Sequence, residues 1–586
     1  MPEALVPATL RFHDGTPYSE AFADVYHNAN GGIPKKRHVF LAGNGLPERW
    51  AGRERFVIFE TGFGPGLNFL VTLEAWRRDP ARCARLHYVA IEKHPFTLGD
   101  LQALHARYDL DAAELHARWP TLVPGAQRIE LEGGRVALTL FFGDIALVRD
   151  LRLKADAFYL DGFSPAKNAD MWSPQVMRAL ARLAAPGATA ATWSVAASVR
   201  SALEATGFTI EKRPGYGEKK EMLVARYARG MATPPPQRSA TVIGAGLAGA
   251  AVCERLCARG WEVDLYERHA EPALEASGNH AGAFHPIVTP DDSVFARLTR
   301  AAFLYSSSRL RALNARWDPC GVLQLARDAR EEDSQRRSIA ALALPHDYAQ
   351  CVSREEASRH AGVPVSAAGV WFPQAGWIQP RSLAQALIES CGARLRRHFS
   401  SEVATLPAGV VVLANGAEAT KLHRVPDLRL RKVRGQLTHV PEDALDAPHV
   451  VVLRGGMVLP PVQGICVVGA SYDMDDDDAG SRAESDEGNL QRLAHILGTK
   501  VRATALDSRV GFRAVTPDRL PVAGKIEGDI CGAFGYGSRG LVWAQLAAEL
   551  IACELEGEPL PIEGKLAEAT SPLRFTRRAA ARGLRP

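Results

Sequence analysis

The chain has 586 residues, of which 46% are hydrophobic and 23% are charged. This length exceeds what a single hydrophobic core usually holds, and the composition is that of a globular protein, which excludes a small single domain and a disordered chain. The formal net charge of +4 is too small to indicate a dedicated nucleic-acid binder.

The targeting and cysteine patterns also narrow the possibilities. Residues 1–15 lack a basic stretch followed by an apolar run, and no segment is apolar for long enough to cross a bilayer. The nine cysteines are scattered, so we expect neither a disulfide framework nor a metal site. These features predict a cytoplasmic protein without a membrane anchor.

Three consecutive prolines, Pro234 to Pro236, mark the main boundary of the chain. They cannot continue a helix or a central strand and favour a stiff connector. Short apolar runs alternate with helical patterns on both sides, which is typical of α/β folds. We therefore predict a first domain over residues 1–230, a linker over 231–239 and a second domain over 240–586. The expected strands are residues 56–59, 88–91, 157–160, 241–243, 410–413, 450–453 and 465–468, with a closing helix over 541–555.

The later part of the second domain has a mixed pattern that favours two interleaved subdomains. The acidic run at residues 473–478 lacks the spacing of a calcium loop, so we expect an ordinary solvated loop there.

A glycine-rich turn follows the first predicted strand, in the sequence FVIFETGFGPGLNFL. Glycines let the backbone turn tightly and approach a ligand at the carboxyl end of a strand. The next strand ends in Glu92, where a carboxylate is placed to bind ribose hydroxyls. The predicted cofactor-binding residues of this turn are Glu60, Gly62, Gly64 and Gly66.

The form E-x-G-x-G-x-G resembles class I S-adenosylmethionine-dependent methyltransferases more than dinucleotide folds. In the fold that it resembles, Asp144 lies near the adenine and Asp161 points at the methyl sulfonium. Methyl transfer to an amine requires loss of a proton, so we assign Asp161 as the general base. The alternative is an aspartate that caps a turn or a helix.

A second glycine fingerprint follows the linker, in ATVIGAGLAGAAVCERLCARGWEVDLYERH. Gly244, Gly246 and Gly249 lie between a predicted strand and a helix, and Glu267 ends the next strand. The order of these elements indicates a dinucleotide site that binds either FAD or NAD, with the pyrophosphate at the helix N-terminus.

Two later segments favour FAD. In ASGNHAGAFHP, small residues including Gly278 would let a flavin ring approach the backbone. Near the C-terminus, a turn with Gly535, Gly537 and Gly540 leads into another helix, whose N-terminus could point toward the flavin.

Taken together, these motifs resemble one family, the bifunctional tRNA 5-methylaminomethyl-2-thiouridine biosynthesis proteins called MnmC. The resemblance covers nearly the whole chain. It rests on DVYHNANGG, HVFLAGNGLPERW, ETGFGPGLNF, LDGFSPAKNADMW, VIGAGLAGA, ASGNHAGAFHP, VRGQLTHVP, GFRAVTPDRLPVAG and GSRGL.

The resemblance implies an N-terminal methyltransferase with a Rossmann-like fold that uses S-adenosylmethionine. It implies a C-terminal FAD-binding Rossmann fold of the D-amino-acid and glycine oxidase type, with an α+β substrate subdomain. The implied substrate is the wobble uridine (U34) in the anticodon loop of tRNA. The FAD half would remove the carboxymethyl group of 5-carboxymethylaminomethyluridine, with or without the 2-thio group, and the other half would methylate the resulting amine.

The resemblance also implies roles for two arginines. Arg513 matches the carboxylate-binding arginine of glycine oxidase, and Arg539 in GSRGL is a second candidate near the flavin. A guanidinium fork suits a substrate carboxylate, although either arginine could instead form a structural salt bridge. The chain departs from the family pattern at Ala169, where proline is expected, and at Pro34, Lys35 and Lys36, where acidic residues are expected.

Two other functions remain open at this point. The chain could be an FAD-dependent oxidase of small amines or amino acids fused to an unrelated methyltransferase. It could also be an RNA-binding protein that retains cofactor folds only as structure, although intact Glu60, Glu92, Asp161 and Glu267 argue against that. No recognised RNA-binding module or obligatory protein partner is evident from the sequence.

Overall fold

The computed structural model describes residues 3–13, 15–26, 32–217, 219–230, 237–500 and 503–581. Contacts divide the chain into two compact units. One contains Ala4–Pro235 together with Glu556–Lys565, and the other contains Met1–Glu3, Pro236–Leu555 and Leu566–Pro586. Most of the expected linker, including its prolines, lies outside the described residues. The domain limits inferred from the sequence stay a prediction.

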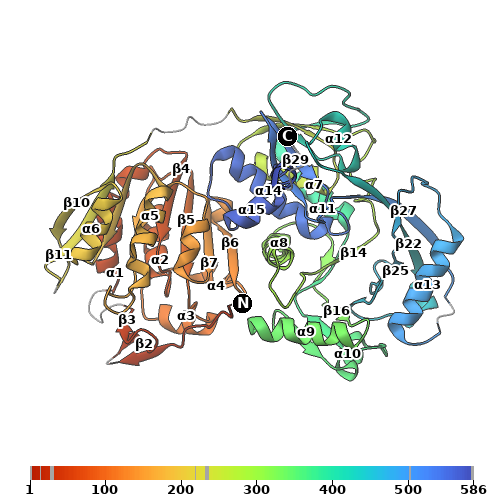
Figure 1. Cartoon of the computed structure of the whole chain (residues 1–586), viewed down its shortest axis with the longest axis horizontal. Helices are drawn as coiled ribbons and strands as arrows, with labels where there is room; N and C mark the ends of the chain where they lie inside the picture. Colours follow the sequence, from red (N-terminus) through yellow and green to blue (C-terminus); the bar gives the residue numbers. More distant parts are fainter. Residues whose placement is uncertain are drawn as a thin grey trace. The chain divides into compact units, whose positions relative to one another are not determined.

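The described part of the first unit is built on an eight-stranded sheet (Figure 1). Its strands, in spatial order, are β10 (Phe208–Pro214), β11 (Glu221–Tyr227), β9 (Ala184–Thr192), β8 (Ala155–Tyr159), β4 (Arg55–Glu60), β5 (Arg85–Glu92), β7 (Val136–Phe142) and β6 (Gly125–Leu131). The central strands β9, β8, β4, β5 and β7 are parallel, whereas β6, β10 and β11 pair antiparallel with their neighbours.

The helices of this unit are α1 (Gly32–Lys36), α2 (Leu67–Arg78), α3 (Leu98–His105), α4 (Ala113–Ala117), α5 (Pro174–Leu183) and α6 (Ala197–Ala205). A small antiparallel sheet of β1 (Arg11–His13), β2 (Thr16–Ser19) and β3 (Asp24–Val25) precedes them. The core is apolar and rich in aromatic side chains, among them Trp50, Phe69 and Tyr88. The parallel strands all end at one edge of the sheet, which is where such folds place a cofactor.

A six-stranded sheet forms the nucleotide-binding part of the second unit. Its order is β20 (Leu395–His398), β13 (Glu262–Tyr266), β12 (Ser239–Ile243), β21 (Val410–Leu413), β29 (Ile530–Phe534) and β28 (Val522–Glu527), as far as the described residues go. The first five strands are parallel, and β28 pairs antiparallel with β29. Helices α7 (Leu247–Cys257) and α11 (Pro380–Ser390) pack against each other beside it.

The second sheet of this unit has nine strands in the described residues. They are β17 (Gln350–Val352), β18 (Gly369–Phe372), β16 (Val322–Leu325), β23 (Val451–Leu453), β24 (Met457–Val458), β25 (Ile465–Gly469), β22 (Arg431–Pro441) and β26 (Asp473–Met474), with β27 (Asp507–Val515) also paired to β22. Helix α13 (Ala483–Leu497) packs on β22 and β25. The two sheets take their strands alternately from the chain, which is the interleaving that the sequence predicted.

The remaining described helices and strands lie outside these two sheets. They are the strands β14 (Gly282–Phe284), β15 (Trp317–Asp318) and β19 (Gly376–Ile378), and the helices α8 (Val294–Leu310), α9 (Ala329–Leu342), α10 (Arg354–Ala361), α12 (Ala419–Leu422), α14 (Gly540–Glu556), α15 (Gly564–Thr570) and α16 (Arg574–Ala581). Among the described residues, no helix combines the length and hydropathy that a bilayer crossing needs.

Candidate functional site

The glycine turn of the first unit leads from β4 into α2 and lines a cavity at the carboxyl edge of the sheet. Gly64 has φ of 51° and Gly66 has φ of 73°, a backbone region in which glycine is favoured. A Cβ on Gly62 would lie 3.4 Å from the main-chain oxygen of Asp161. The turn therefore brings bare backbone to the cavity wall, as a cofactor loop requires.

Glu92 and Asp144 lie at neighbouring strand ends of the same cavity. Glu92 accepts hydrogen bonds from the amides of Gly64 (2.6 Å) and His94 (2.7 Å). Burial raises the pKa of Glu92, and these two amide bonds oppose that rise. Asp144 caps the turn that follows β7 by accepting from the amide of Ala146, and it also pairs with Lys93 (3.0 Å). Both carboxylates keep lone pairs with which to accept hydrogen bonds from a ribose or an adenine, so these residues fit S-adenosylmethionine.

Asp161 follows β8 and faces the same cavity. Its carboxylate accepts a hydrogen bond from Asn68 of α2 (2.8 Å) and is in contact with the Lys36 ammonium. The Thr61 hydroxyl donates to its main-chain oxygen (2.7 Å). Asp161 does not cap a helix here, although its Oδ1 accepts from the amide of Gly162 (3.0 Å), and its role as the general base stays a prediction.

Glu60 lies behind the glycine turn and does not line the cavity. Its side chain is fully buried, and it accepts hydrogen bonds from Tyr88 (2.7 Å) and Asn68. Its position differs from that of a residue in contact with the cofactor. Through Asn68, Glu60 supports Asp161. Gly66 is likewise outside the cavity wall and lies at the N-cap of α2, where a Cβ would lie 2.7 Å from the Phe63 ring.

Burial, together with the charge of Asp161, raises the pKa of Glu60 to about 8 from an ordinary value of 4.5. Between these two values the folded protein binds a proton that the unfolded chain releases, so stability falls as the pH rises through this window. We expect Glu60→Gln to make the free energy of unfolding depend less on pH. The part of this dependence that Glu60 contributes is at most about 4 to 5 kcal/mol. Thermal denaturation of the full chain at pH 5.5 and pH 8.5 measures this change in stability.

The control for this measurement is Glu74→Gln, because Glu74 pairs with Arg37 and Arg78 on the outside of α2. This variant should keep the pH dependence of the original protein. If Glu60→Gln and the original protein lose stability equally on going to pH 8.5, Glu60 is ionised throughout and the assignment is wrong.

A histidine pair holds the outer side of the glycine turn. His105 Nε2 lies 2.7 Å from the Pro65 carbonyl oxygen, and His105 Nδ1 lies 2.8 Å from His116 Nε2. Because the carbonyl can only accept, His105 donates through Nε2 and accepts from His116 through Nδ1. Burial lowers the pKa of His105, which favours the neutral form that this arrangement needs.

The second glycine turn connects β12 to α7 in the other unit. Gly244 has φ of 101°, and a Cβ there would lie 2.8 Å from the Ala414 carbonyl oxygen. Glu267 accepts from the amides of Ala245 (2.8 Å) and His269 (3.0 Å) and thereby ties the turn to the end of β13. A cavity of about 430 Å³ lined by Gly244, Gly246 and Glu267 adjoins the turn. The cradle fits the adenosine end of FAD.

Gly249 and Gly278 lie outside the walls of the cavities of about 430 Å³ and 550 Å³ in this unit, and their assignment as cofactor contacts stays a prediction. A Cβ on Gly249 would lie 1.8 Å from the Gly244 carbonyl oxygen, so this glycine lets α7 pack closely on the turn. A Cβ on Gly278 would lie 2.1 Å from Arg509 Nη2, so this glycine leaves room for that guanidinium.

We expect Gly249→Ala to abolish stoichiometric FAD binding, because the new methyl group displaces the backbone that should face the pyrophosphate. The flavin content of purified protein, read from its visible absorbance, tests this. Gly488→Ala on α13 is the matched control, since its Cβ would meet only Arg492 Nη1 at 3.5 Å. Full flavin content in Gly249→Ala would contradict the assignment.

A second cavity, of about 550 Å³, shares Gly246, Ala276 and Ser277 with the first and extends toward β27. Gly537, Arg539 and Gly540 line it at the start of α14, and Arg513 lines it from β27. The isoalloxazine end of FAD and an organic substrate both fit a cavity of this size.

Arg513 is held by its neighbours without a carboxylate in contact with its guanidinium among the described residues. Its Nη1 donates to the Ser471 carbonyl oxygen (3.1 Å), and the guanidinium lies 5.6 Å from the centre of the Tyr472 ring. Burial lowers its pKa. Gly435 on the adjacent strand β22 makes room for it, because a Cβ there would lie 2.2 Å from Arg513 Nη1. This arrangement suits a bidentate grip on a substrate carboxylate.

Arg539 lies on the other side of this cavity, next to His285. Its Nη1 is 3.4 Å from His285 Nε2, and His285 Nδ1 is 2.8 Å from the Pro286 carbonyl oxygen. Burial and the Arg539 charge lower the pKa of His285 to about 3, so the histidine is neutral and its Nε2 faces the guanidinium as an acceptor. Burial lowers the pKa of Arg539 to about 10, which leaves it charged at neutral pH.

Much of the acidic run is exposed to solvent, as we expected, and arginines hold it in place. Arg434 is fully buried and donates to the carbonyl oxygen of Asp478 (2.8 Å) and the carboxylate of Asp473 (3.1 Å). Arg482 pairs with Asp476 (2.6 Å) and Asp478 (2.8 Å). These ion pairs shape the loop beside the adenosine cavity, which Asp477 lines.

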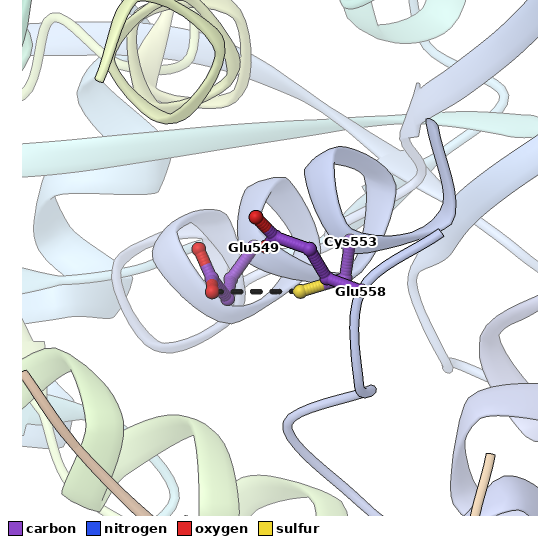
Figure 2. Close-up of side chains that lie close together, drawn as sticks. All are labelled: Glu549, Cys553 and Glu558. Carbon is purple, nitrogen blue, oxygen red and sulfur yellow. Dashed lines mark hydrogen bonds between the residues drawn. The ribbon is translucent and has the colours of Figure 1, made fainter. Parts of the chain in front are cut away.

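Several other buried carboxylates have arginine partners. Figure 2 shows Glu549 and Cys553 on α14, where the thiol lies 3.5 Å from the carboxylate. Glu549 also pairs with Arg259 (2.8 Å), and Glu558 pairs with Arg85 (3.2 Å). Ion pairing accounts for these carboxylates, and the absence of a metal site stays a prediction.

Sequence reasoning did not select several residues that line the two sites. In the first unit they are Phe22, Tyr26, Lys36 and Asn68, and in the second they are Ser277, His285, Ser471 and Tyr472. Asn68 and His285 stand inside the quoted motifs, and Lys36 was noted only as a departure from the family pattern. No sequence signal marks Tyr472, because its place depends on the fold of β26 against β22.

Comparisons with known proteins define the class. The model of the FAD dependent oxidoreductase family matches residues 239–554, and the model of an S-adenosyl-L-methionine-dependent methyltransferase family matches residues 108–228. The chain is thus an FAD-dependent oxidoreductase joined to an S-adenosylmethionine-dependent methyltransferase, which confirms the predicted fold classes and cofactors. A glycine oxidase from Geobacillus kaustophilus is similar in structure, with a TM-score of 0.49 and 22% identity over 55% of this chain and 95% of that one.

Full-length relatives define the family. The tRNA 5-methylaminomethyl-2-thiouridine biosynthesis bifunctional protein MnmC of Azoarcus sp. (strain BH72) is 46% identical over 98% of this chain and 99% of its own length. The protein of the same name from Paraburkholderia phytofirmans is 45% identical over the full length of both chains. The chain belongs to the MnmC family, as its motifs indicated, and it is a bifunctional enzyme.

Proposed function

We propose that this chain performs two successive reactions on the wobble uridine of tRNA. The FAD unit removes the carboxymethyl group of 5-carboxymethylaminomethyluridine, with or without the 2-thio group, and releases glyoxylate. The methyltransferase unit then methylates the primary amine that remains. The names of the full-length relatives support tRNA as the substrate, and a cytoplasmic location belongs to the same proposal.

The observation that carries the proposal is the pairing of two complementary sites in one chain. The FAD-type cavity presents the guanidinium of Arg513, which suits a carboxylate attached to an amine. The other cavity presents the carboxylate of Asp161, which suits an amine that carries no carboxylate. The product expected of the FAD-type site is an amine without a carboxylate, and this is the kind of group that the cavity with Asp161 suits.

The residues of the chain have distinct tasks in this scheme. FAD, when bound, would accept a hydride from the carbon beside the amine nitrogen, water would hydrolyse the resulting imine, and S-adenosylmethionine, when bound, would supply the methyl group. Arg513 binds the substrate carboxylate and so fixes which carbon is oxidised. Asp161 accepts a hydrogen bond from the N–H group of the acceptor amine and removes the proton that methylation displaces.

Nucleoside mass spectrometry tests the proposal. Transfer RNA that carries 5-carboxymethylaminomethyluridine is incubated with the full chain, with and without S-adenosylmethionine. The aminomethyl form should accumulate without the methyl donor, and the methylaminomethyl form should appear with it. If the tRNA stays unchanged while free glycine or sarcosine is oxidised, the enzyme is a small-molecule amine oxidase and the proposal fails.

A further inference from the structure

Lys36 is the last residue of α1. Its side chain is 9% exposed, and its ammonium contacts the carboxylate of Asp161. The ammonium also lies 5.3 Å from the centre of the Phe40 ring. Lys36 and Asp161 line the same cavity. A fixed positive charge therefore contacts the carboxylate that we expect to bind the acceptor amine.

The charges near Lys36 come from several elements. Asp161 faces it from the loop after β8, and Glu60 faces it from the end of β4. Burial and the charge of Asp161 raise the pKa of Glu60 to about 8, which reduces its negative charge at neutral pH. Asp161 is therefore the carboxylate that balances Lys36.

The other charged groups nearby have partners or lie along other parts of the wall. Arg37 pairs with Glu74 of α2, and Lys35 lies 3.8 Å from the centre of the Trp193 ring. The further titratable groups of the cavity wall are Asp24, which pairs with Lys167, Asp144, which pairs with Lys93, and Tyr26, Glu92, His94 and Asp170.

A carboxylate alone would make a poor site for methyl transfer to an amine. It attracts the ammonium form of the acceptor, which has no lone pair. Transfer of the proton from an alkylammonium to an aspartate is also uphill by about six pKa units. A fixed positive charge on the same carboxylate opposes this preference, because a nearby cation favours the neutral form of an amine.

We propose that Lys36 sets the protonation state of the acceptor, so that the amine binds beside Asp161 in its neutral, nucleophilic form. This proposal rests on the proposed function of the methyltransferase unit. The neutral acceptor nitrogen gives its lone pair to the methyl carbon, while the C–S bonding pair remains on sulfur. The positive charge thereby passes from sulfur to nitrogen, and the methylated nitrogen then loses its proton to Asp161.

The first test is the pH profile of methyl transfer at saturating tRNA that carries 5-aminomethyluridine. With Lys36→Met, the acidic limb of the kcat profile should move to higher pH by about one unit, because the bound amine becomes harder to deprotonate. Lys36→Arg should keep the original profile, since it keeps the charge. Lys35→Met, which removes the same charge from the same helix outside the cavity wall, should also keep it.

The second test measures binding without the reaction. S-adenosylmethionine carries a sulfonium charge, whereas S-adenosylhomocysteine is a neutral thioether, so the ratio of their affinities by calorimetry reports the potential at the transferred methyl group. Lys36→Met should raise this ratio in favour of S-adenosylmethionine by about tenfold. Lys36→Arg and Lys35→Met should leave the ratio unchanged.

These outcomes separate the two proposals. If the original protein methylates no tRNA at any pH, the proposed function fails, and the affinity ratio still decides the role of Lys36. If the original protein methylates tRNA while Lys36→Met keeps the original pH profile or the original affinity ratio, the inference about Lys36 is overturned and the function stands.

Discussion

Asp161→Asn should stop methyl transfer while the FAD-dependent step proceeds at its normal rate. The amide cannot take up the proton that leaves the acceptor, and the Lys36 ammonium loses the charge that it contacts. General-base contributions of this kind are about 100-fold to 10,000-fold in rate. On tRNA that carries 5-carboxymethylaminomethyluridine, the variant should accumulate the aminomethyl form even with S-adenosylmethionine present.

The control for this experiment is Asp111→Asn, an exposed aspartate that pairs with Arg77 away from the cavity. It should leave both products unchanged. If Asp161→Asn folds and yet loses both activities, the division of labour between the two cavities is wrong. If it retains full methylation, Asp161 is not the base.

Arg513→Ala should weaken the FAD-dependent step at the level of substrate binding. The variant removes a charge-assisted contact to the substrate carboxylate in a partly desolvated cavity, which is worth about 3 kcal/mol or roughly 100-fold in kcat/KM. Most of the loss should appear in KM. Steady-state kinetics of glyoxylate release, measured on the same tRNA, would separate KM from kcat.

Two further variants calibrate this result. Arg513→Lys keeps the positive charge but loses the fork geometry of the guanidinium. Its kcat/KM should therefore lie between that of the original protein and that of Arg513→Ala. Arg431→Ala on β22, whose guanidinium lies 3.8 Å from the sulfur of Met474, should behave like the original protein. An unchanged KM in Arg513→Ala would remove this residue from the substrate site.

The sequence predicted the central strands well because they are short apolar runs with clear ends. The runs at residues 56–59 and 410–413 correspond to β4 and β21. The direction of the edge strands could not be predicted in the same way. Strands β6 and β10 pair antiparallel with neighbours that are close in sequence, and periodicity within one strand does not report the direction of its partner.

The sequence predicted where the two glycine turns lie, but it did not predict the contacts between side chains around them. Glycine spacing located both turns, because the backbone requirement is local. The burial of Glu60 behind its turn and the contact between Lys36 and Asp161 depend on packing between distant elements. The close approach of Arg509 to Gly278 likewise joins residues more than 200 positions apart.

The segment Glu556–Lys565 belongs to the methyltransferase unit although it follows the last long helix of the other unit. Arg128 donates to the Pro559 carbonyl oxygen (2.6 Å), and Glu558 is nearly fully buried beside Arg85 and His87. The methyltransferase unit is therefore made of two segments that are separate in the sequence. A methyltransferase half excised at the proline-rich stretch would leave Arg85 and Arg128 without these partners, so a viable split protein or a domain exchange has to carry this segment along.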